Sequence, residues 1–223
     1  MRKTALVLSF LLATGLWAKS KEAERIEDAA TAFEEIMAAP DKGIPRDVLS
    51  RAQCVAIIPS MKKVAIGFGG QHGKGLVSCR MTGGGWGPPS MLTLTGGSFG
   101  LQLGAQATDV FMLIMNKRGI DYLTRDKFEV GGDLSAAAGP VGREATAGTD
   151  VGLRAEIYTY SRSKGLFGGI SLKGAAVRPD KDANRSLYGR AVEARDLLLE
   201  GNAAPPADAK PFMAALSKYG ARR

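Results

Sequence analysis

The sequence predicts an α+β domain in which a curved antiparallel β-sheet or partial barrel is covered by helices from both ends of the chain. Three observations point to this class. Apolar residues recur at helical spacing near the N-terminus, alternate with a period of two through the middle of the chain, and return to helical spacing after residue 179. The chain has 223 residues, 45% hydrophobic and 23% charged, which fits one globular domain with its own core.

Residues 1–18 have the organisation of a cleaved secretory signal peptide. Arg2 and Lys3 precede an uncharged, Leu-rich run over residues 4–16, which ends at Trp17 and Ala18 before polar residues begin. The run is shorter than the roughly 20 residues of a membrane-spanning helix, and no later segment is long and apolar enough to replace it. We therefore expect cleavage after Ala18 and an exported protein, periplasmic or secreted, with no transmembrane span in the mature chain.

Residues 22–39 predict an amphipathic helix. Its apolar residues, including Ile26, Phe33 and Ile36, recur at spacings of three and four, and Pro40 and Gly43 end the pattern. The polar side is rich in Glu, which favours packing against the domain core over insertion into a membrane. A short helical turn is expected after Pro45.

The middle of the chain predicts antiparallel strands joined by glycine-rich turns. Residues 54–58 form an apolar run, residues 64–68 alternate, and residues 76–80 follow a glycine turn at 69–75. Residues 83–89, rich in Gly and Pro, predict a loop that exposes Trp86. A strand starts at residues 91–95, and residues 99–115 predict a long central strand. Its end, residues 110–115, is apolar at every position, as expected where both sheet faces are covered.

The second half of the chain predicts a short helix, a hairpin and terminal helices. Residues 116–128 favour a turn and a short helix, and the small residues of 131–148 favour a closely packed strand. Residues 151–176 predict a hairpin whose solvent-facing side carries Tyr158 and Tyr160. Helix signals return at residues 186–200.

We predict one domain over residues 19–200, then an Ala/Pro linker and a weakly docked C-terminal helix within residues 201–223.

The charge distribution predicts an anionic partner. Lys and Arg outnumber Asp and Glu by 30 to 22, a net charge of +8, and cleavage after Ala18 would leave +6. No acidic residue lies between Asp47 and Asp109, and residues 151–178 contain a single acid, Glu156, among five basic residues. Basic residues on strands often serve only solubility and edge protection, but a solvated face normally mixes signs. An uncompensated basic face attracts phosphate, on lipid or on nucleic acid.

The two cysteines, Cys54 and Cys79, leave two alternatives open. An even count in an exported chain suggests a disulfide, worth about 3 kcal/mol in the chain-entropy model. The alternative is a pair of buried thiols on neighbouring strands.

Several catalytic and binding chemistries are disfavoured by the residues present. His72 is the only histidine and no cysteine pair has metal spacing, which argues against a zinc site or a Ser-His-Asp triad. Gly73 and Lys74 do not complete a phosphate-binding loop. Ser161 and Lys164 match an S-x-x-K spacing without its partner motif. Few aromatic residues accompany the basic ones, so we do not expect a nucleic-acid partner. We also expect no cofactor and no metal. Asn184 begins a glycosylation sequon.

Three separated motifs make the chain resemble the SYLF domain family. They are residues 94–116, which begin Leu-Thr-Gly-Gly-Ser-Phe-Gly, residues 138–143 and residues 160–174, and the likeness extends over roughly residues 23–198. The resemblance implies a lipid-binding module, whose eukaryotic members bind phosphoinositides and actin filaments and carry SH3 or FYVE domains, and whose bacterial members are exported single domains. It implies a binding protein and no enzyme. Eukaryotic lipid contact is attributed to a basic N-terminal helix, whereas the first helix here is acidic.

The sequence therefore predicts non-enzymatic, peripheral binding of anionic phospholipid, with phosphoinositide-like or other acidic head groups. The candidate lipid-binding residues combine basic side chains with two aromatic ones for shallow apolar contact: Lys62, Lys63, Lys74, Arg80, Trp86, Arg162, Lys164, Phe167 and Lys173. The alternative is an envelope scaffold or protein-interaction module, with actin binding as in eukaryotic members. An enzyme with an unrecognised site is a third hypothesis.

Overall fold

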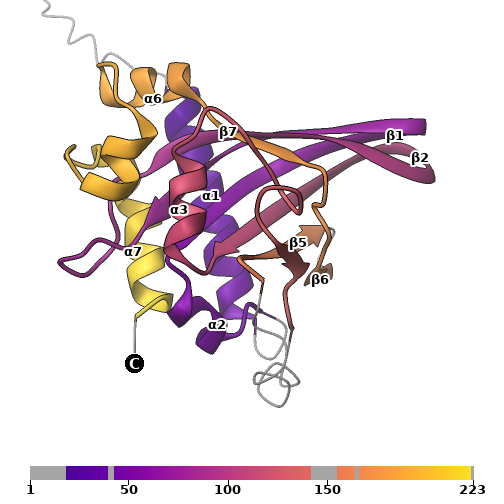
Figure 1. The fold of residues 1–223 in the computed structure, drawn as a ribbon, viewed down its shortest axis with the longest axis horizontal. Helices are drawn as coiled ribbons and strands as arrows, with labels where there is room; N and C mark the ends of the chain where they lie inside the picture. Colours follow the sequence, from indigo (N-terminus) through magenta and orange to yellow (C-terminus); the bar gives the residue numbers. More distant parts are fainter. Residues whose placement is uncertain (1–18, 40–42, 142–154, 164–165, 222–223) are drawn as a thin grey trace, which may run out of the picture.

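The computed structural model describes residues 19–39, 43–141, 155–163 and 166–221, with the backbone alone for residues 64–68 and 98–105. It confirms the α+β class: a strongly curled sheet is covered by helices from both ends of the chain (Figure 1). The predicted signal peptide, the small-residue strand beyond residue 141 and the first residues of the predicted hairpin lie outside the described residues.

The predicted N-terminal helix is confirmed as α1 (Lys21–Ala38). Ser20 caps it, because its side-chain Oγ accepts a hydrogen bond from the backbone N–H of Ala23 at 3.1 Å. Ile26, Phe33 and Ile36 are at most 2% exposed, and each contributes roughly 1.5–3 kcal/mol through the hydrophobic effect. The helical turn after Pro45 is α2 (Arg46–Arg51).

The central strands are longer than the sequence predicts. β1 (Cys54–Cys79) and β2 (Ser90–Ile114) pair antiparallel from Cys54 opposite Ile114 to Val77 opposite Ser90. The glycine turn expected at residues 69–75 is wrong, since these residues pair with β2 inside β1. A glycine run permits a turn, but here a continuous partner strand satisfies its backbone hydrogen bonds.

β1 doubles back on itself, and this sets the shape of the molecule. Cys54 and Cys79 stand at its two ends, yet their Cα atoms are 4.0 Å apart and the residues form a disulfide. A straight strand of this length would span about 80 Å. The two halves of β1 meet at glycines: a Cβ on Gly75 would clash with the Ile57 carbonyl oxygen and lie 2.8 Å from the Ile58 Cα. The disulfide is thus formed, and the free-thiol alternative is wrong.

The remaining strands extend this pair into a mixed sheet. β5 (Ile157–Ser163) pairs with residues 109–114 of β2, and β7 (Ala176–Pro179) pairs with residues 92–95. β3 (Phe128–Glu129) and β6 (Leu166–Gly169) add antiparallel edges to β7 and β5. β4 (Ala136–Ala138) pairs parallel with β5, so the sheet is not antiparallel throughout.

Helices cover both faces of the sheet. On one face, α1, α2 and α7 (Lys210–Tyr219) pack against every second residue of β1 and β2 and form the first core. On the other face, α3 (Lys117–Leu123) and η1 (Asp196–Glu200) pack against the intervening residues of these strands and form the second core. α6 (Lys181–Tyr188) and the 3₁₀ turn η2 (Ala207–Ala209) complete the C-terminal part. α6 starts five residues earlier than predicted because Asp180 caps it, accepting from the Ala183 N–H at 3.1 Å.

Two expectations about burial are wrong. Tyr158 and Tyr160 are at most 2% exposed, because β5 lies inside the sheet and the first core covers the side that we expected to face solvent. The C-terminal helix is firmly docked, since Phe212 and Leu216 are fully buried against that same core. Alternation along β5 identifies its two faces but not what covers them.

Candidate ligand-binding groove

The predicted lipid-binding residues do not form a single face. Lys62 and Lys74 come together at a groove beside α1, whereas Arg80 and Trp86 lie near the C-terminus. Lys63 is half-buried on β1, and Lys173 is exposed in the turn before β7. Lys164 lies outside the described residues.

Arg80 and Trp86 have structural roles. The Arg80 side chain donates to the carbonyl oxygen of Ala52 at 2.9 Å and to that of Gly220, and its guanidinium lies 4.3 Å from the centre of the Trp86 ring. Trp86 is 7% exposed, so the exposed loop tryptophan that we expected is buried. Arg80 thereby joins the end of α2 to the end of α7.

Arg162 is also held by other residues of the chain. Its Nε and Nη2 atoms donate to one Asp109 carboxylate oxygen at 3.1 and 2.8 Å, and Nη1 pairs with Glu35 of α1. The second Asp109 oxygen accepts from the backbone N–H of Ser60 at 2.9 Å. Ser60 has a φ of 49°, rare for a residue with a side chain, and lies where the register of β1 with β2 shifts, so Asp109 stabilises this bulge. Phe167 is half-buried and stacks on Tyr160, with ring centres 5.5 Å apart.

The groove beside α1 has a volume of about 490 Å³. One wall is the face of α1 that carries Lys21, Glu24, Arg25 and Asp28, at the three- and four-residue spacing of one helical face. The other wall consists of two stretches of β1, residues 59–62 and 72–74. These stretches are separated in sequence and meet only because β1 doubles back.

Arg25 is the residue of the groove with an unsatisfied donor. Its Nη1 atom is buried and makes no hydrogen bond within the described residues. No ion pair within 4 Å joins Lys21, Arg25 or Lys62 to an acid of the described chain. Lys74, in contrast, pairs with Asp180 at 2.7 Å. Partial burial would raise the pKa of Asp180, but Lys74, the Ala183 N–H and the charge of Arg25 outweigh it and hold this pKa below its usual value.

The residues of α1 that line this groove were not among the site residues predicted from the sequence. We expected an acidic helix and assigned no site residue to it. A signal was present: Lys21 and Arg25 are four residues apart and share a face away from the apolar stripe. What the sequence could not indicate is that this face lies opposite two stretches of one folded strand.

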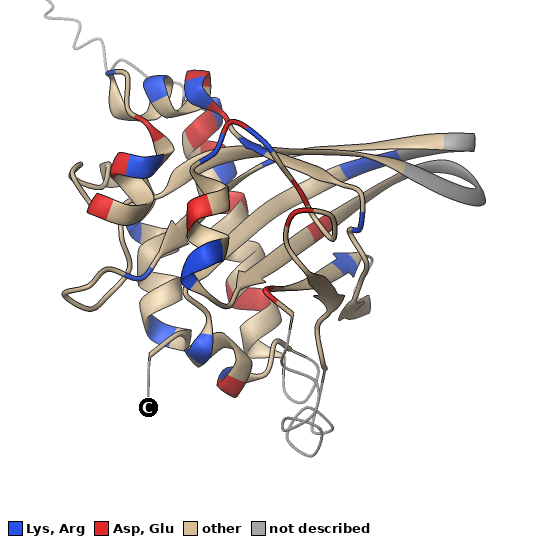
Figure 2. Ribbon diagram, in the orientation of Figure 1, with Lys and Arg blue, Asp and Glu red and all other residues tan. Residues whose placement is uncertain are grey.

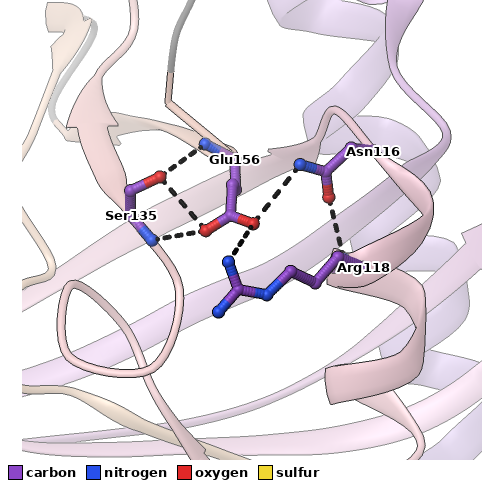
Figure 3. Close-up of polar contacts among 5 residues, drawn as sticks. Asn116, Arg118, Ser135 and Glu156 are labelled. Carbon is purple, nitrogen blue, oxygen red and sulfur yellow. Dashed lines mark hydrogen bonds and ion pairs between the residues drawn. The ribbon is translucent and has the colours of Figure 1, made fainter.

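Glu156 organises a separate polar cluster (Figure 3). Its carboxylate accepts from the Ser135 N–H at 3.0 Å, from Asn116 at 3.4 Å and from Arg118 at 3.3 Å. Partial burial would raise the pKa of Glu156, but these hydrogen bonds and the Arg118 charge outweigh it and lower the pKa. Asn116 also caps α3 by accepting from the Gly119 N–H at 2.9 Å. The cluster joins the start of α3 to β4 and β5, which is a structural role.

Other candidate chemistry finds no site in the described part of the chain. Asn184 of the sequon is fully buried, with its side chain bonded to the Met91 N–H and to Ser90, so the folded chain does not present it for glycosylation. No three His, Cys, Asp or Glu side chains among the described residues are grouped to hold a metal ion.

Within the described residues, no helix has the length and apolar character needed to cross a membrane.

Comparison with known proteins identifies relatives of this chain by sequence. The family model of Ysc84, described as "Las17-binding protein actin regulator", matches residues 95–219. The chain is 38% identical over 177 residues to an SH3 domain-containing protein of Schizosaccharomyces pombe, covering 78% of this chain and 41% of that protein. It is 34% identical over 205 residues to LAS seventeen-binding protein 3 of Saccharomyces cerevisiae, covering 90% and 44%.

A vertebrate relative, SH3 domain-containing YSC84-like protein 1 of Bos taurus, is 31% identical over 201 residues, covering 89% of this chain and 58% of the relative. The chain thus spans about half the length of these curated relatives. The matched family segment runs from the second strand of the central pair to the last helix. The chain belongs to the Ysc84 family, whose domain is also called SYLF.

Proposed function

We propose that this Ysc84-family domain binds anionic phospholipid surfaces peripherally and without catalysis. One observation carries the proposal: the acid-free stretch between Asp47 and Asp109 builds the doubled part of β1 and its partner β2. We call residues 61–75 of β1 and 92–108 of β2 the β1–β2 arm. Acidic residues gather mainly on the helices, whereas the described part of this arm carries basic segments (Figure 2).

The available charges on the arm are Lys62 and Lys63. Lys62 is exposed, Lys63 is half-buried, and neither forms an ion pair within 4 Å in the described chain. Near an anionic bilayer each basic residue contributes about 1 kcal/mol, and the net charge of the chain adds a longer-range attraction that salt weakens. Arg80, Trp86 and Arg162 drop out of the proposed surface because other residues of the chain hold them. Lys173 remains a candidate, and Lys164 stays a prediction.

Vesicle binding at two salt concentrations tests this function. We compare the unchanged protein with a Lys62→Glu/Lys63→Glu variant on phosphatidylglycerol-containing and pure phosphatidylcholine vesicles. The salt-sensitive component is the quantity measured, because insertion of the apolar residues 4–16 would not respond to salt. The arm variant should lose at least about thirtyfold in salt-sensitive affinity, since two attractive charges of about 1 kcal/mol each are removed and reversed.

A matched variant separates local from general charge effects. Lys117→Glu/Lys210→Glu changes the net charge equally at exposed positions of α3 and α7. Equal losses of salt-sensitive affinity in the two variants would mean that binding depends on net charge alone and not on the position of Lys62 and Lys63 on the arm. The absence of any salt-sensitive binding by the unchanged protein would refute the proposal.

A protein partner is the second candidate function. The family description and the yeast relative are named for Las17 binding, and the family description names actin regulation. One structural observation favours a protein surface here: Leu166 is 78% exposed on the edge strand β6. Co-sedimentation with actin filaments tests this function. Binding that persists at high salt and is lost in the Leu166→Ser variant would support it. Binding that salt abolishes, or no binding, would exclude it.

We also propose that the protein is exported. The organisation of residues 1–18 supports this, and a buried disulfide is typical of oxidising compartments. N-terminal sequencing of the protein from its native cells tests the proposal: a chain beginning at Lys19 is expected, and a chain retaining residues 1–18 in the cytoplasmic fraction would contradict it.

A further inference from the structure

We infer that the groove between α1 and the doubled strand β1 binds one singly charged phosphate group, the phosphodiester of a phospholipid head group. The lipid source rests on the function proposed above, whereas the phosphate site rests on the groove alone. In this site, α1 contributes ligand-binding residues in addition to its packing against the core.

The geometry of the groove brings donors together from three places. Arg25 extends from α1, Lys62 follows the bulge at Ser60, and Lys74 belongs to the returning half of β1. Asp109 holds the bulge through the Ser60 N–H, and Asp180 holds Lys74 at 2.7 Å. The disulfide between Cys54 and Cys79 fixes the two halves of β1 relative to each other. The backbone that carries Lys62 and Lys74 is therefore fixed before a ligand arrives, which lowers the entropic cost of binding.

The state of Arg25 points to an anion. A buried N–H group of a guanidinium without an acceptor is costly, and native structures rarely leave one unpaired. The Nη1 atom of Arg25 is buried without a partner in the described chain, and the half-buried Arg25 side chain lines the groove. A small rotation of this side chain would bring Nη1 to a phosphate oxygen in the groove, which would supply the missing acceptor, and the guanidinium is the side chain best suited to phosphate.

The charge balance of the groove indicates a single negative charge on the ligand. Lys21, Arg25, Lys62 and Lys74 bring four positive charges. Glu24 and Asp28 line the same groove, and Asp180 pairs with Lys74, so three negative charges oppose the four positive ones and an excess of +1 remains. A phosphodiester carries one negative charge and matches this excess. A polyphosphorylated head group would meet the two carboxylates of α1 and be repelled.

The lining favours a lipid over a nucleic acid as the source of the phosphodiester. Among the residues that line the groove, His72 has the only aromatic ring, so a base stacking platform is missing. The groove also lies at the base of the basic β1–β2 arm, so a bilayer that contacts the arm would present its head groups here.

Calorimetric titration with soluble ligands tests the site without a membrane. The ligands are glycerophosphoglycerol, inorganic phosphate, inositol trisphosphate and a short single-stranded oligonucleotide. Glycerophosphoglycerol should bind at one site, and inositol trisphosphate should bind no more tightly. Arg25→Gln should weaken glycerophosphoglycerol at least about tenfold, since a hydrogen bond to a charged group is lost. Arg46→Gln, an exposed position on α2 outside the groove, should leave the affinity unchanged.

Arg25 is half-buried, so a change there can disturb α1, and a second variant at an exposed position keeps the test decisive. Lys62 is exposed, so Lys62→Gln should keep the fold by circular dichroism and still weaken glycerophosphoglycerol several-fold. No binding of glycerophosphoglycerol, or equal affinity in both groove variants and the control, would overturn the inference. Much tighter binding of inositol trisphosphate would overturn the single-charge assignment, and tighter binding of the oligonucleotide would overturn the lipid source.

The two proposals fail in distinguishable ways. If the arm variant loses vesicle binding but no soluble phosphate compound binds, the lipid function stands and the groove site is wrong. If glycerophosphoglycerol binds through Arg25 but vesicles show no salt-sensitive binding, the phosphate site stands and the membrane function is wrong.

Discussion

Glu156 shows how one side chain can hold together parts of the chain that are distant in sequence. Its carboxylate accepts hydrogen bonds from Ser135, Asn116 and Arg118, and its side chain is only 13% exposed. The neighbours are donors, so the ionised form is the one they stabilise. Removing the charge would leave these donors with a poorer acceptor in a site that water reaches little.

Glu156→Gln should therefore destabilise the protein by about 1–3 kcal/mol at neutral pH. The folded-state pKa is lowered, so this contribution is fully present above the pKa of an unfolded Glu, about 4.3, and is lost as pH falls through the lower folded value. Urea unfolding at pH 7 and at acid pH should show a difference between variant and unchanged protein that shrinks in acid.

Glu34→Gln is the control for this experiment, because Glu34 is exposed on α1. It should change the free energy of unfolding by less than about 0.5 kcal/mol at either pH. An equal effect of the two substitutions, or an effect of Glu156→Gln that does not depend on pH, would contradict the role given to the cluster.

At the scale of elements, the doubled strand β1 depends on glycine where its halves touch. A Cβ at Gly75 would meet the backbone of Ile57 and Ile58, with the Ile58 Cα at 2.8 Å. Backbone cannot move aside as a flexible side chain can. Gly75→Ala should lower the free energy of unfolding by about 1–3 kcal/mol, measured by denaturant unfolding.

Gly70 is a control in the same strand, because a Cβ there would meet nothing within 4 Å. Neither glycine has a positive φ, so both sites accept Ala conformationally. Gly70→Ala should be neutral or slightly stabilising, since Ala restricts the unfolded chain. If both substitutions had the same effect, close contact between the halves of β1 would not be the reason for Gly75.

At the scale of the whole molecule, the disulfide closes the curl of the sheet. Cys54 and Cys79 are fully buried and separated by 25 residues, so the bond restricts a loop that includes nearly all of β1. In the chain-entropy model such a loop contributes about 3 kcal/mol. The oxidised protein should lose about this much stability in the Cys54→Ala/Cys79→Ala variant.

Chemical reduction provides an independent arm of this measurement. The unchanged protein unfolded in the presence of a reductant should match the double variant to within about 1 kcal/mol, and the reductant should not affect the variant. Equal stability of the oxidised protein and the double variant would contradict a stabilising bond.

Local patterns were sufficient for the elements whose partners are near in sequence. The apolar spacing of α1, with Pro40 after it, predicted the helix almost to its ends, and the α+β class followed from the change of period at residue 54. Burial at β5 was not predictable in this way. Alternation separated Ile157 from Tyr158, but only the packing of α1, α2 and α7 decided that both faces are covered.

The candidate site depended even more on distant contacts. The sequence identified Lys62 and Lys74 as basic residues without nearby acids, and it also selected Arg80, Trp86 and Arg162, which the fold uses internally. A basic side chain near an acid in space is neutralised whatever its sequence neighbours are, as Asp180 does for Lys74 across 106 residues. Charge runs therefore predict candidates, and tertiary contacts select among them.

By itself the sequence determined the helices at both ends, the strand-rich middle and the excess of basic charge. Only the tertiary structure decided that residues 69–75 continue a strand, that Cys54 meets Cys79, and that Arg25 faces Lys62 and Lys74 across a groove. The physical reason is the range of the interactions. Helical spacing and turn preferences act over a few residues, whereas the doubling of β1 rests on backbone contacts between its own halves and on its long register with β2.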